Sequence, residues 1–131
     1  MRTYLDTSAL TKIVVTERES GALRDYLAAI PGDTLFTAAL TRTELIRAAR
    51  RLNAAAVHQA RAVLAGLTTV NLTAGVLDAA AALDPPALRT LDAIHLAAAQ
   101  CAGAELRAVI TYDARMIAAA ESLAIPVLAP V

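Results

Sequence analysis

Short runs of strand-forming residues alternate with longer helical stretches along the whole chain. The candidate strands are RTYL (2–5), TLFT (34–37), LTTVNL (67–72), RAVIT (107–111) and a weaker IPVL (125–128). The candidate helices between them cover residues 8–15, 19–30, 38–52, 54–65, 74–83, 88–102 and 113–124. Strands that alternate with helices usually pair in parallel, with helices on both faces of the sheet. The pattern therefore predicts an α/β fold.

Polar residues and glycines are expected to fix several helix ends. Thr37 is a candidate N-cap for helix 38–52, and Thr90 is a candidate N-cap for the helix that follows it. Gly66 and Gly103 are expected to end helices, because glycine is common just beyond a helical C-terminus. These boundaries leave no linker, so one domain over residues 1–131 is expected.

The composition predicts an aliphatic core and excludes a base-stacking surface. Of the 131 residues 57% are hydrophobic, but there is one Phe, three Tyr and no Trp. The formal net charge is zero, so only local patches could attract nucleic acid or membranes. Arginine supplies eleven of the twelve basic side chains, and two explanations remain open. They are a GC-rich genome and selection for bidentate phosphate contacts.

The chain carries no sign of export or of membrane insertion. Cys101 is the only cysteine, which excludes a disulfide framework and a cysteine metal knuckle. Asp6 interrupts the apolar segment that a signal peptide would need. No apolar run reaches the roughly 18 residues of a membrane span. A cytoplasmic protein without membrane association is therefore expected.

Four acidic residues lie close to strand ends or at the head of an apolar helix. Asp6 directly follows the first strand, and Asp113 follows the fourth strand by one residue. Glu44 lies about two turns into the helix after TLFT, and Asp92 begins the apolar stretch 90–100. Ligands of parallel sheets bind beyond the carboxyl ends of the strands, so Asp6 and Asp113 lie on the expected ligand-binding edge.

Each acid also has a purely structural explanation. Asp6 and Asp113 are suitable helix caps, and Asp92 is favourable near a helix start. Glu44 could pair with Arg47 one turn later. His95 lies one turn after Asp92 on nearly the same face, and a packed or dimer-facing role is the commoner one for such a histidine.

If the four acids converge, their mutual repulsion favours a cation. Two carboxylates about 4 Å apart repel by about 4 kcal/mol at an effective dielectric constant of 20. An all-oxygen ligand set suits Mg²⁺ or Mn²⁺ and does not suit zinc. A cation bound in this way typically acts on phosphates.

Four segments together resemble one family. They are YLDTSAL, TRTELIRA, LRTLDAIHLAAA and VITYDARM, which contain Asp6, Glu44, Asp92 and Asp113 respectively. In this order and spacing they resemble the PIN-domain ribonucleases, and the chain is similar to the VapC-type toxins of toxin–antitoxin pairs. The resemblance covers essentially the whole chain. It implies a three-layer α/β/α domain with a five-stranded parallel sheet.

The resemblance also implies a site and an activity. The four acids would form the catalytic and metal-binding site, with Ser8 and Thr111 supporting them by hydrogen bonds. The position of Thr111 is an acid in some relatives, so a second cation would be held more weakly. The implied reaction is Mg²⁺-dependent (or Mn²⁺-dependent) endoribonucleolytic hydrolysis of RNA, which inhibits translation and growth. Candidate phosphate contacts are Arg47, Arg50, Arg51 and Arg115.

The implied partners are a cognate VapB-type antitoxin, RNA and a second copy of the chain. The antitoxin tail would cover the acidic pocket, with an arginine in place of the cation. Helix 54–65 and the apolar face near 94–98 are candidate dimer contacts.

Two other functions remain as alternatives. The first is a phosphatase with Asp6 as nucleophile, which would need a second acid where this chain has Ser8 and a later catalytic lysine, whereas Lys12 is the only lysine. The second is a catalytically inactive PIN-like binding domain, which the presence of all four acids disfavours. A nucleotide-binding module is disfavoured further, because neither GxGxxG nor GxxxxGK[ST] occurs.

Overall fold

The computed structural model describes residues 1–131 and contains one five-stranded parallel sheet. The strands are β1 (Arg2–Leu5), β2 (Thr34–Ala38), β3 (Thr68–Val70), β4 (Leu106–Ile110) and β5 (Val127–Leu128). Their spatial order is β3-β2-β1-β4-β5, and every neighbouring pair is parallel. The chain thus builds outward from β1 on one side and resumes at β4 on the other. This reversal places the expected ligand site at the carboxyl ends of β1 and β4.

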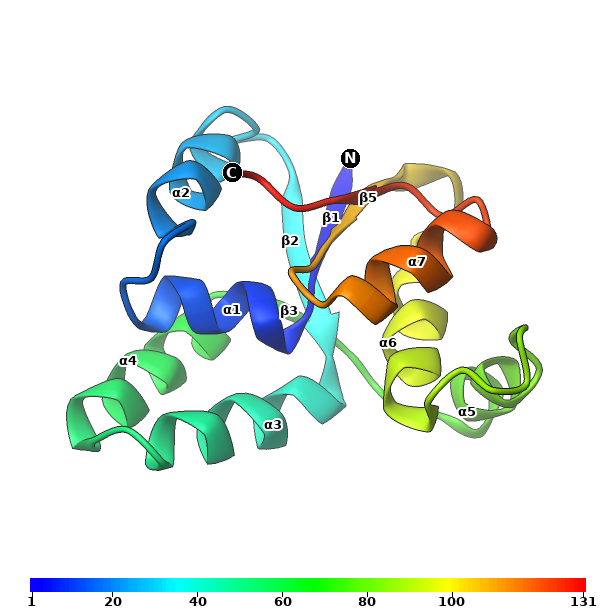
Figure 1. Cartoon of the computed structure of the whole chain (residues 1–131), viewed down its shortest axis with the longest axis horizontal. Helices are drawn as coiled ribbons and strands as arrows, with labels where there is room; N and C mark the ends of the chain where they lie inside the picture. The colour runs from blue at the N-terminus through cyan, green and yellow to red at the C-terminus, as the bar shows by residue number, and fades with distance from the viewer.

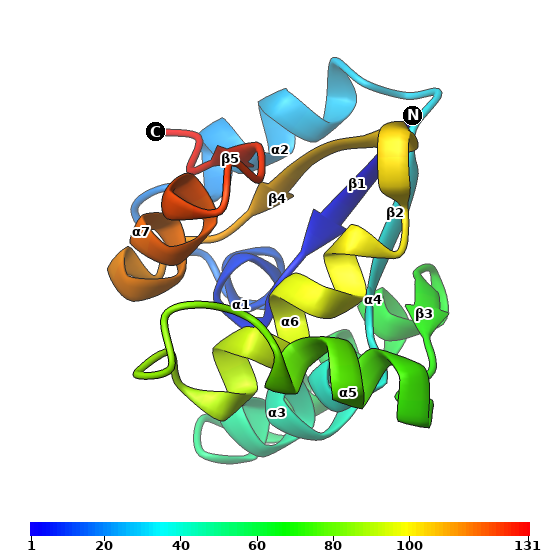
Figure 2. The same ribbon diagram turned by 90° about the vertical axis from the view of Figure 1, so that its right-hand side faces the viewer.

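Helices cover both faces of the sheet. On one face lie α1 (Thr7–Val14), α2 (Ser20–Ala28), α3 (Ala39–Arg50) and α4 (Ala54–Ala65). On the other lie α5 (Ala74–Ala81), α6 (Thr90–Gln100) and α7 (Ala114–Ser122), as Figures 1 and 2 show. A short 3₁₀ turn (Gly103–Glu105) before β4 was not predicted. No helix combines the length and the apolar character that crossing a bilayer requires. The predicted three-layer α/β/α architecture is confirmed.

The two layers of core follow from the alternation of side chains along the strands. Tyr4, Phe36 and Val109 point to the face covered by α6 and α7, whereas Leu5 and Ile110 point to the face covered by α1, α3 and α4. All five side chains are fully buried. The rings of Tyr4 and Phe36 meet edge to face with centroids 5.2 Å apart. The aromatic residues are few, but two of them lie at the centre of the fold.

The helix caps were predicted only in part. Asp6 caps α1 and Asp113 caps α7 through their carboxylates, so the capping role predicted for each residue is confirmed. The predictions for Thr37 and Thr90 were wrong, because Ala38 and Arg89 occupy the cap positions of α3 and α6. The Thr37 hydroxyl is buried and donates instead to the carbonyl of Leu5, with its oxygen 2.7 Å from Thr41 Oγ1.

An ion-pair cluster closes the opposite, amino-terminal edge of the sheet. The carboxylate of Asp33, next to β2, accepts two hydrogen bonds from Arg107 on β4, at 2.6 and 2.9 Å. It also accepts one from the Thr3 hydroxyl on β1 at 2.7 Å. The Arg107 guanidinium holds the pKa of the Asp33 carboxyl well below its usual range, and Thr3 adds to this effect. The cluster therefore ties three parts of the sheet together far from the acidic residues of the sequence motifs.

Candidate active site

A pocket of about 280 Å³ opens at the carboxyl ends of β1 and β4. Its lining is polar except for one methionine and consists of Asp6, Thr7, Ser8, Thr11, Glu44, Asp92, His95, Asp113 and Met116. The fold thus brings the four acids of the sequence motifs to one pocket from four separate segments. Figure 1 shows why: the ends of β1 and β4 and the first turns of α1, α3 and α6 gather below the sheet.

Asp6 is the most rigidly held of the four acids. One carboxylate oxygen accepts hydrogen bonds from Ser8 Oγ at 2.7 Å and from the Ala9 amide at 3.0 Å. The other accepts from Thr111 Oγ1 at 2.6 Å. The residue is 3% exposed, and burial raises the pKa of its carboxyl although these hydrogen bonds oppose the rise. Asp6 is therefore fixed in one orientation at a place where its charge is poorly solvated.

Ser8 and Thr111 join the ends of β1 and β4. Their hydroxyl oxygens lie 3.3 Å apart, and each also accepts a backbone hydrogen bond. The Tyr112 amide donates to Ser8 Oγ at 2.9 Å, and the Asp113 amide donates to Thr111 Oγ1 at 3.1 Å. The two hydroxyls therefore set the position of Asp6 and also the path of the chain that leads to Asp113.

Glu44 is held by His95, which sequence reasoning had not assigned to the site. His95 Nε2 lies 2.7 Å from Glu44 Oε1, and the Thr7 hydroxyl donates to the same oxygen at 2.6 Å. Burial raises the pKa of Glu44, but the hydrogen bonds from His95 and Thr7 outweigh it, so the pKa is lowered overall. The alternative ion pair of Glu44 with Arg47 does not form. The one-turn spacing of Asp92 and His95 was the available signal.

The other ring nitrogen of His95 contacts a buried tyrosine. Nδ1 lies 2.6 Å from the hydroxyl of Tyr4 on β1, and His95 itself is 3% exposed. Burial raises the pKa of Tyr4, so its hydroxyl stays protonated at neutral pH. Every group is satisfied when Tyr4 donates to Nδ1 and Nε2–H donates to Glu44. A continuous hydrogen-bonded chain thus runs from the core of the sheet to the pocket.

Asp92 and Asp113 both line the pocket and lie close enough for their charges to interact. Burial raises the pKa of the Asp92 carboxyl, and the negative charge of Asp113 raises it further, while His95 and Arg89 act in the opposite direction. Asp113 accepts a hydrogen bond from the Arg115 amide at 2.9 Å and is otherwise half-buried. The site therefore accumulates negative charge that the surrounding protein does not neutralise.

The chemistry of these donors fits a hard divalent cation. The side chains as placed form no cluster of three acidic, histidine or cysteine ligands around a common point. Mg²⁺ does not need such a cage, because it keeps several water ligands and is commonly held by one or two carboxylates and by substrate phosphates. Asp92 and Asp113, whose charges repel, and the remaining acceptor capacity of Asp6 match this requirement.

The arginines singled out in the sequence lie outside the acidic pocket. Arg47, Arg50 and Arg51 line a separate hollow of about 270 Å³ near the end of α3. Arg115 is exposed on the first turn of α7, two residues beyond Asp113. None of the four lines the pocket that holds the acids.

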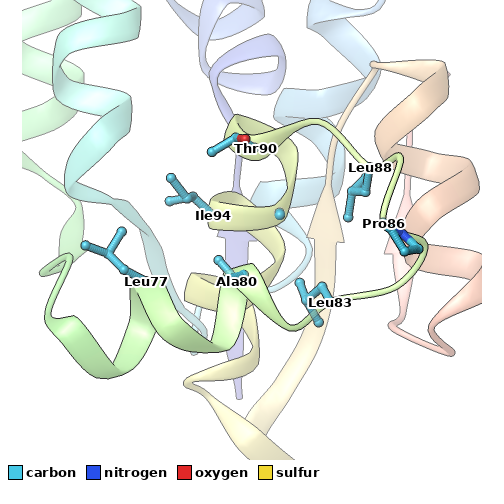
Figure 3. A pocket seen from close by; sticks show the side chains of 9 residues that line it. Leu77, Ala80, Leu83, Pro86, Leu88, Thr90 and Ile94 are labelled. Carbon is cyan, nitrogen blue, oxygen red and sulfur yellow. The ribbon is translucent and has the colours of Figure 1, made fainter.

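A third hollow, of about 430 Å³, is apolar and lies between α5 and α6. Figure 3 shows Leu77 and Ala80 of α5 and Ile94 of α6 around it, with Leu83, Pro86 and Leu88 from the connecting segment. The predicted contact face near 94–98 is wrong beyond Ile94, because Leu96, Ala97 and Ala98 are buried in the core. The hollow carries no titratable group and therefore offers no group for acid–base catalysis.

Comparison with known proteins identifies the family. The sequence profile of the PIN domain matches residues 3–122. Ribonuclease VapC35 from Mycobacterium tuberculosis strain H37Rv is 46% identical over 129 residues, which cover 97% of this chain and 96% of the relative.

Solved structures show the same fold. VapBC2 from Rickettsia felis, bound to a DNA fragment from its promoter, has a TM-score of 0.79 at 11% identity and covers 100% of both chains. VapC20 from Mycobacterium tuberculosis, described as a sarcin-ricin loop cleaving toxin, has a TM-score of 0.71 at 19% identity and covers 89% of this chain and 94% of that one. The chain belongs to the PIN domain family and, within it, to the VapC ribonucleases.

Proposed function

We propose that the chain is a divalent-metal-dependent endoribonuclease and the toxin of a toxin–antitoxin pair. The observation that carries the proposal is the convergence of Asp6, Glu44, Asp92 and Asp113 on one pocket at the switch point of the sheet. The name of the 46% identical relative, a ribonuclease, supports RNA as the substrate.

Asp6, Asp92 and Asp113 would hold Mg²⁺ or Mn²⁺, with Glu44 as a further ligand or as the group that orients water. A bound divalent ion supplies two things in phosphodiester hydrolysis: it lowers the pKa of a water molecule and it stabilises charge on the phosphate oxygens. No side chain has to act as a nucleophile in such a reaction.

The residues of the chain then have distinct tasks. Ser8 and Thr111 hold the Asp6 carboxylate in one orientation. His95 and Thr7 keep Glu44 ionised and aimed at the pocket, where its free oxygen can accept a hydrogen bond from water. Positioning of this kind contributes to rate because the groups need not reorganise during the reaction. Arg47, one turn after Glu44, and Arg115, two residues after Asp113, are candidates for contacts with substrate phosphates.

The structure argues against the phosphatase alternative. The Asp6 carboxylate accepts three hydrogen bonds, which reduce its nucleophilicity. Lys12 does not reach the pocket, because it pairs with Glu17 at 3.0 Å and with Glu19 at 2.7 Å. An inactive binding domain would not need four acids in one pocket, where the repulsion between Asp92 and Asp113 is unfavourable.

The proposed partners follow from the relatives. We infer a VapB-type antitoxin that covers the acidic pocket, and inhibition of translation and growth when the antitoxin is absent. We also infer a cytoplasmic homodimer, with the apolar hollow of Figure 3 and its exposed Leu77 as the contact face. Light scattering of the wild-type chain and of Leu77→Glu checks the dimer, which the substitution should weaken.

RNA cleavage by purified variants tests the proposed activity. Single-stranded RNA should be cut by the wild-type chain in Mg²⁺ and spared in excess EDTA. Asp6→Asn and Asp92→Asn should each lose at least about a hundredfold in rate, because each removes a charged metal contact. Asp25→Asn, an exposed acid on α2, is the matched control and should leave the rate unchanged. Full activity of either site variant would overturn the proposal.

A further inference from the structure

Positive charge is concentrated in one stretch of this neutral chain. Residues 34–77 contain five arginines, at positions 42, 47, 50, 51 and 61, and a single acid, Glu44. The stretch therefore carries a net charge of plus four, although the whole chain sums to zero. The only acid in it is already engaged by His95. The α3–α4 part of the surface thus has a positive field that the overall composition conceals.

Three of these arginines share one hollow. Arg47, Arg50 and Arg51 form the entire lining of the cavity near the end of α3, and no apolar side chain contributes to it. The ion pairs of the protein involve the N-terminus, Lys12, His95 and Arg107, and none of these three guanidinium groups. The helix dipole stabilises a basic side chain in the last turn of a helix by about 0.3–1 kcal/mol, which is enough to explain one such residue. It does not account for three guanidinium groups that converge with no acid between them.

The hollow is connected to the acidic pocket by a single rigid element. Glu44, in the pocket, and Arg47, in the hollow, are one turn apart on α3. At a rise of 1.5 Å per residue, Arg51 lies about 10 Å along the axis from Glu44. Figure 1 shows α3 running from the edge of the sheet outward to α4. Stacked nucleotides advance about 3.4 Å along one strand, so this distance corresponds to about three nucleotides.

We propose that Arg47, Arg50 and Arg51 form a phosphate-binding subsite for the RNA backbone about three nucleotides from the bond that is cut in the acidic pocket. The inference rests on the proposed ribonuclease function and adds that the RNA substrate runs along α3. The guanidinium fork matches phosphate oxygens in a bidentate manner. An acidic peptide is a poorer occupant, because peptides anchor through apolar side chains as well and this lining includes no apolar residue.

Binding of RNA to a non-cleaving variant tests the subsite without metal. Fluorescence anisotropy of a labelled oligouridine of about twelve nucleotides would be measured in EDTA, with Asp6→Asn as the common background. The triple substitution Arg47→Gln, Arg50→Gln, Arg51→Gln should raise Kd about tenfold. It should also reduce the slope of log Kd against log salt by about two, since each single-strand phosphate contact contributes about 0.7. Arg18→Gln, an exposed arginine between Glu17 and Glu19, is the control and should change neither quantity.

Substrate length provides a second readout in the Mg²⁺-loaded enzyme with Asp6 intact. The triple substitution should raise KM by a larger factor for RNA longer than about four nucleotides than for a dinucleotide, because a dinucleotide does not reach the hollow. Unchanged Kd and salt slope in a folded triple variant would overturn the subsite even if the wild-type chain cuts RNA. Weaker binding of oligoglutamate with unchanged RNA binding would also overturn it, in favour of a protein partner. Failure of the wild-type chain to cut RNA at all would instead refute the ribonuclease proposal.

Discussion

Nε2 of His95 lies 2.7 Å from Oε1 of Glu44, although 51 residues separate the two in the sequence. The contact joins α6 to α3 across the carboxyl edge of the sheet. Because Nδ1 of the same ring contacts the Tyr4 hydroxyl at 2.6 Å, the position of Glu44 is set from inside the core. The protein thus favours the ionised form of Glu44, whose side chain is half-buried.

Removal of His95 should weaken catalysis although His95 is not an acid of the site. His95→Ala leaves the Glu44 carboxylate with Thr7 as its remaining side-chain partner, so we expect RNA cleavage to fall about 10–100-fold, the usual range for residues that orient metal-site groups. His58→Ala, which alters the other histidine, exposed on α4, is the control. Cleavage rates within twofold of wild type for His95→Ala would contradict the positioning role.

The Tyr4 hydroxyl should contribute to stability and to the alignment of His95. Tyr4→Phe keeps the ring and its edge-to-face contact with Phe36 but leaves Nδ1 of His95 without a donor. We expect a loss of about 1–2 kcal/mol in the free energy of unfolding, measured by urea denaturation. Tyr26→Phe, on the half-exposed face of α2, should change stability by less than about 0.5 kcal/mol. Equal effects of the two substitutions would contradict the proposed hydrogen bond.

The fold could be predicted from the sequence because its signals are local. Alternation of RTYL, TLFT and RAVIT with helical stretches indicates the parallel sheet, and it needs no knowledge of distant contacts. The acids Asp6 and Asp113 could be placed at the site edge for the same reason: Asp6 follows a strand directly and Asp113 comes shortly after one. That Thr37 is not the cap of α3 could not be predicted, because the reason is the burial of its hydroxyl against the Leu5 carbonyl of a neighbouring strand.

His95 was missed as a site residue for a comparable reason. Its partners Tyr4 and Glu44 lie 91 and 51 residues away, so no local pattern distinguishes it from a histidine that only packs. The Asp33–Arg107 pair, 74 residues apart, was likewise invisible in the sequence. The arginine hollow required the structure as well, since nothing in the sequence shows that Arg47, Arg50 and Arg51 converge.

Asp33 should stabilise the protein at neutral pH and lose this effect in acid. Its pKa in the folded state lies below the usual value of 3.8, so its contribution is complete above that value and declines as the pH falls through the folded-state pKa. We expect Asp33→Asn to lower the free energy of unfolding by about 2–3 kcal/mol at pH 7. The difference should shrink below about pH 4. Asp25→Asn is the control, and a pH-independent difference for Asp33→Asn would be inconsistent with this account.

Asp92 should have the opposite effect on the metal-free protein. Because its pKa is raised in the folded state, its ionised form destabilises the fold once the pH exceeds its usual value of 3.8. Asp92→Asn should therefore raise the free energy of unfolding at pH 7 by about 0.5 kcal/mol, a small value because solvent screens this largely accessible group.

Mg²⁺ should raise the melting temperature of the wild-type chain more than that of the Asp92→Asn variant. Asp78→Asn on α5 is the control, and an equal response of Asp92→Asn to Mg²⁺ would rule out Asp92 as a metal contact.

The location of a bound cation tests the central claim most directly. Crystals soaked in Mn²⁺ and measured for anomalous scattering should show a peak within coordination distance of Asp6, Asp92 and Asp113, and the same soak of Asp92→Asn should show a weaker peak or none. A strong peak elsewhere on the molecule, with the acidic pocket free of manganese, would contradict the account.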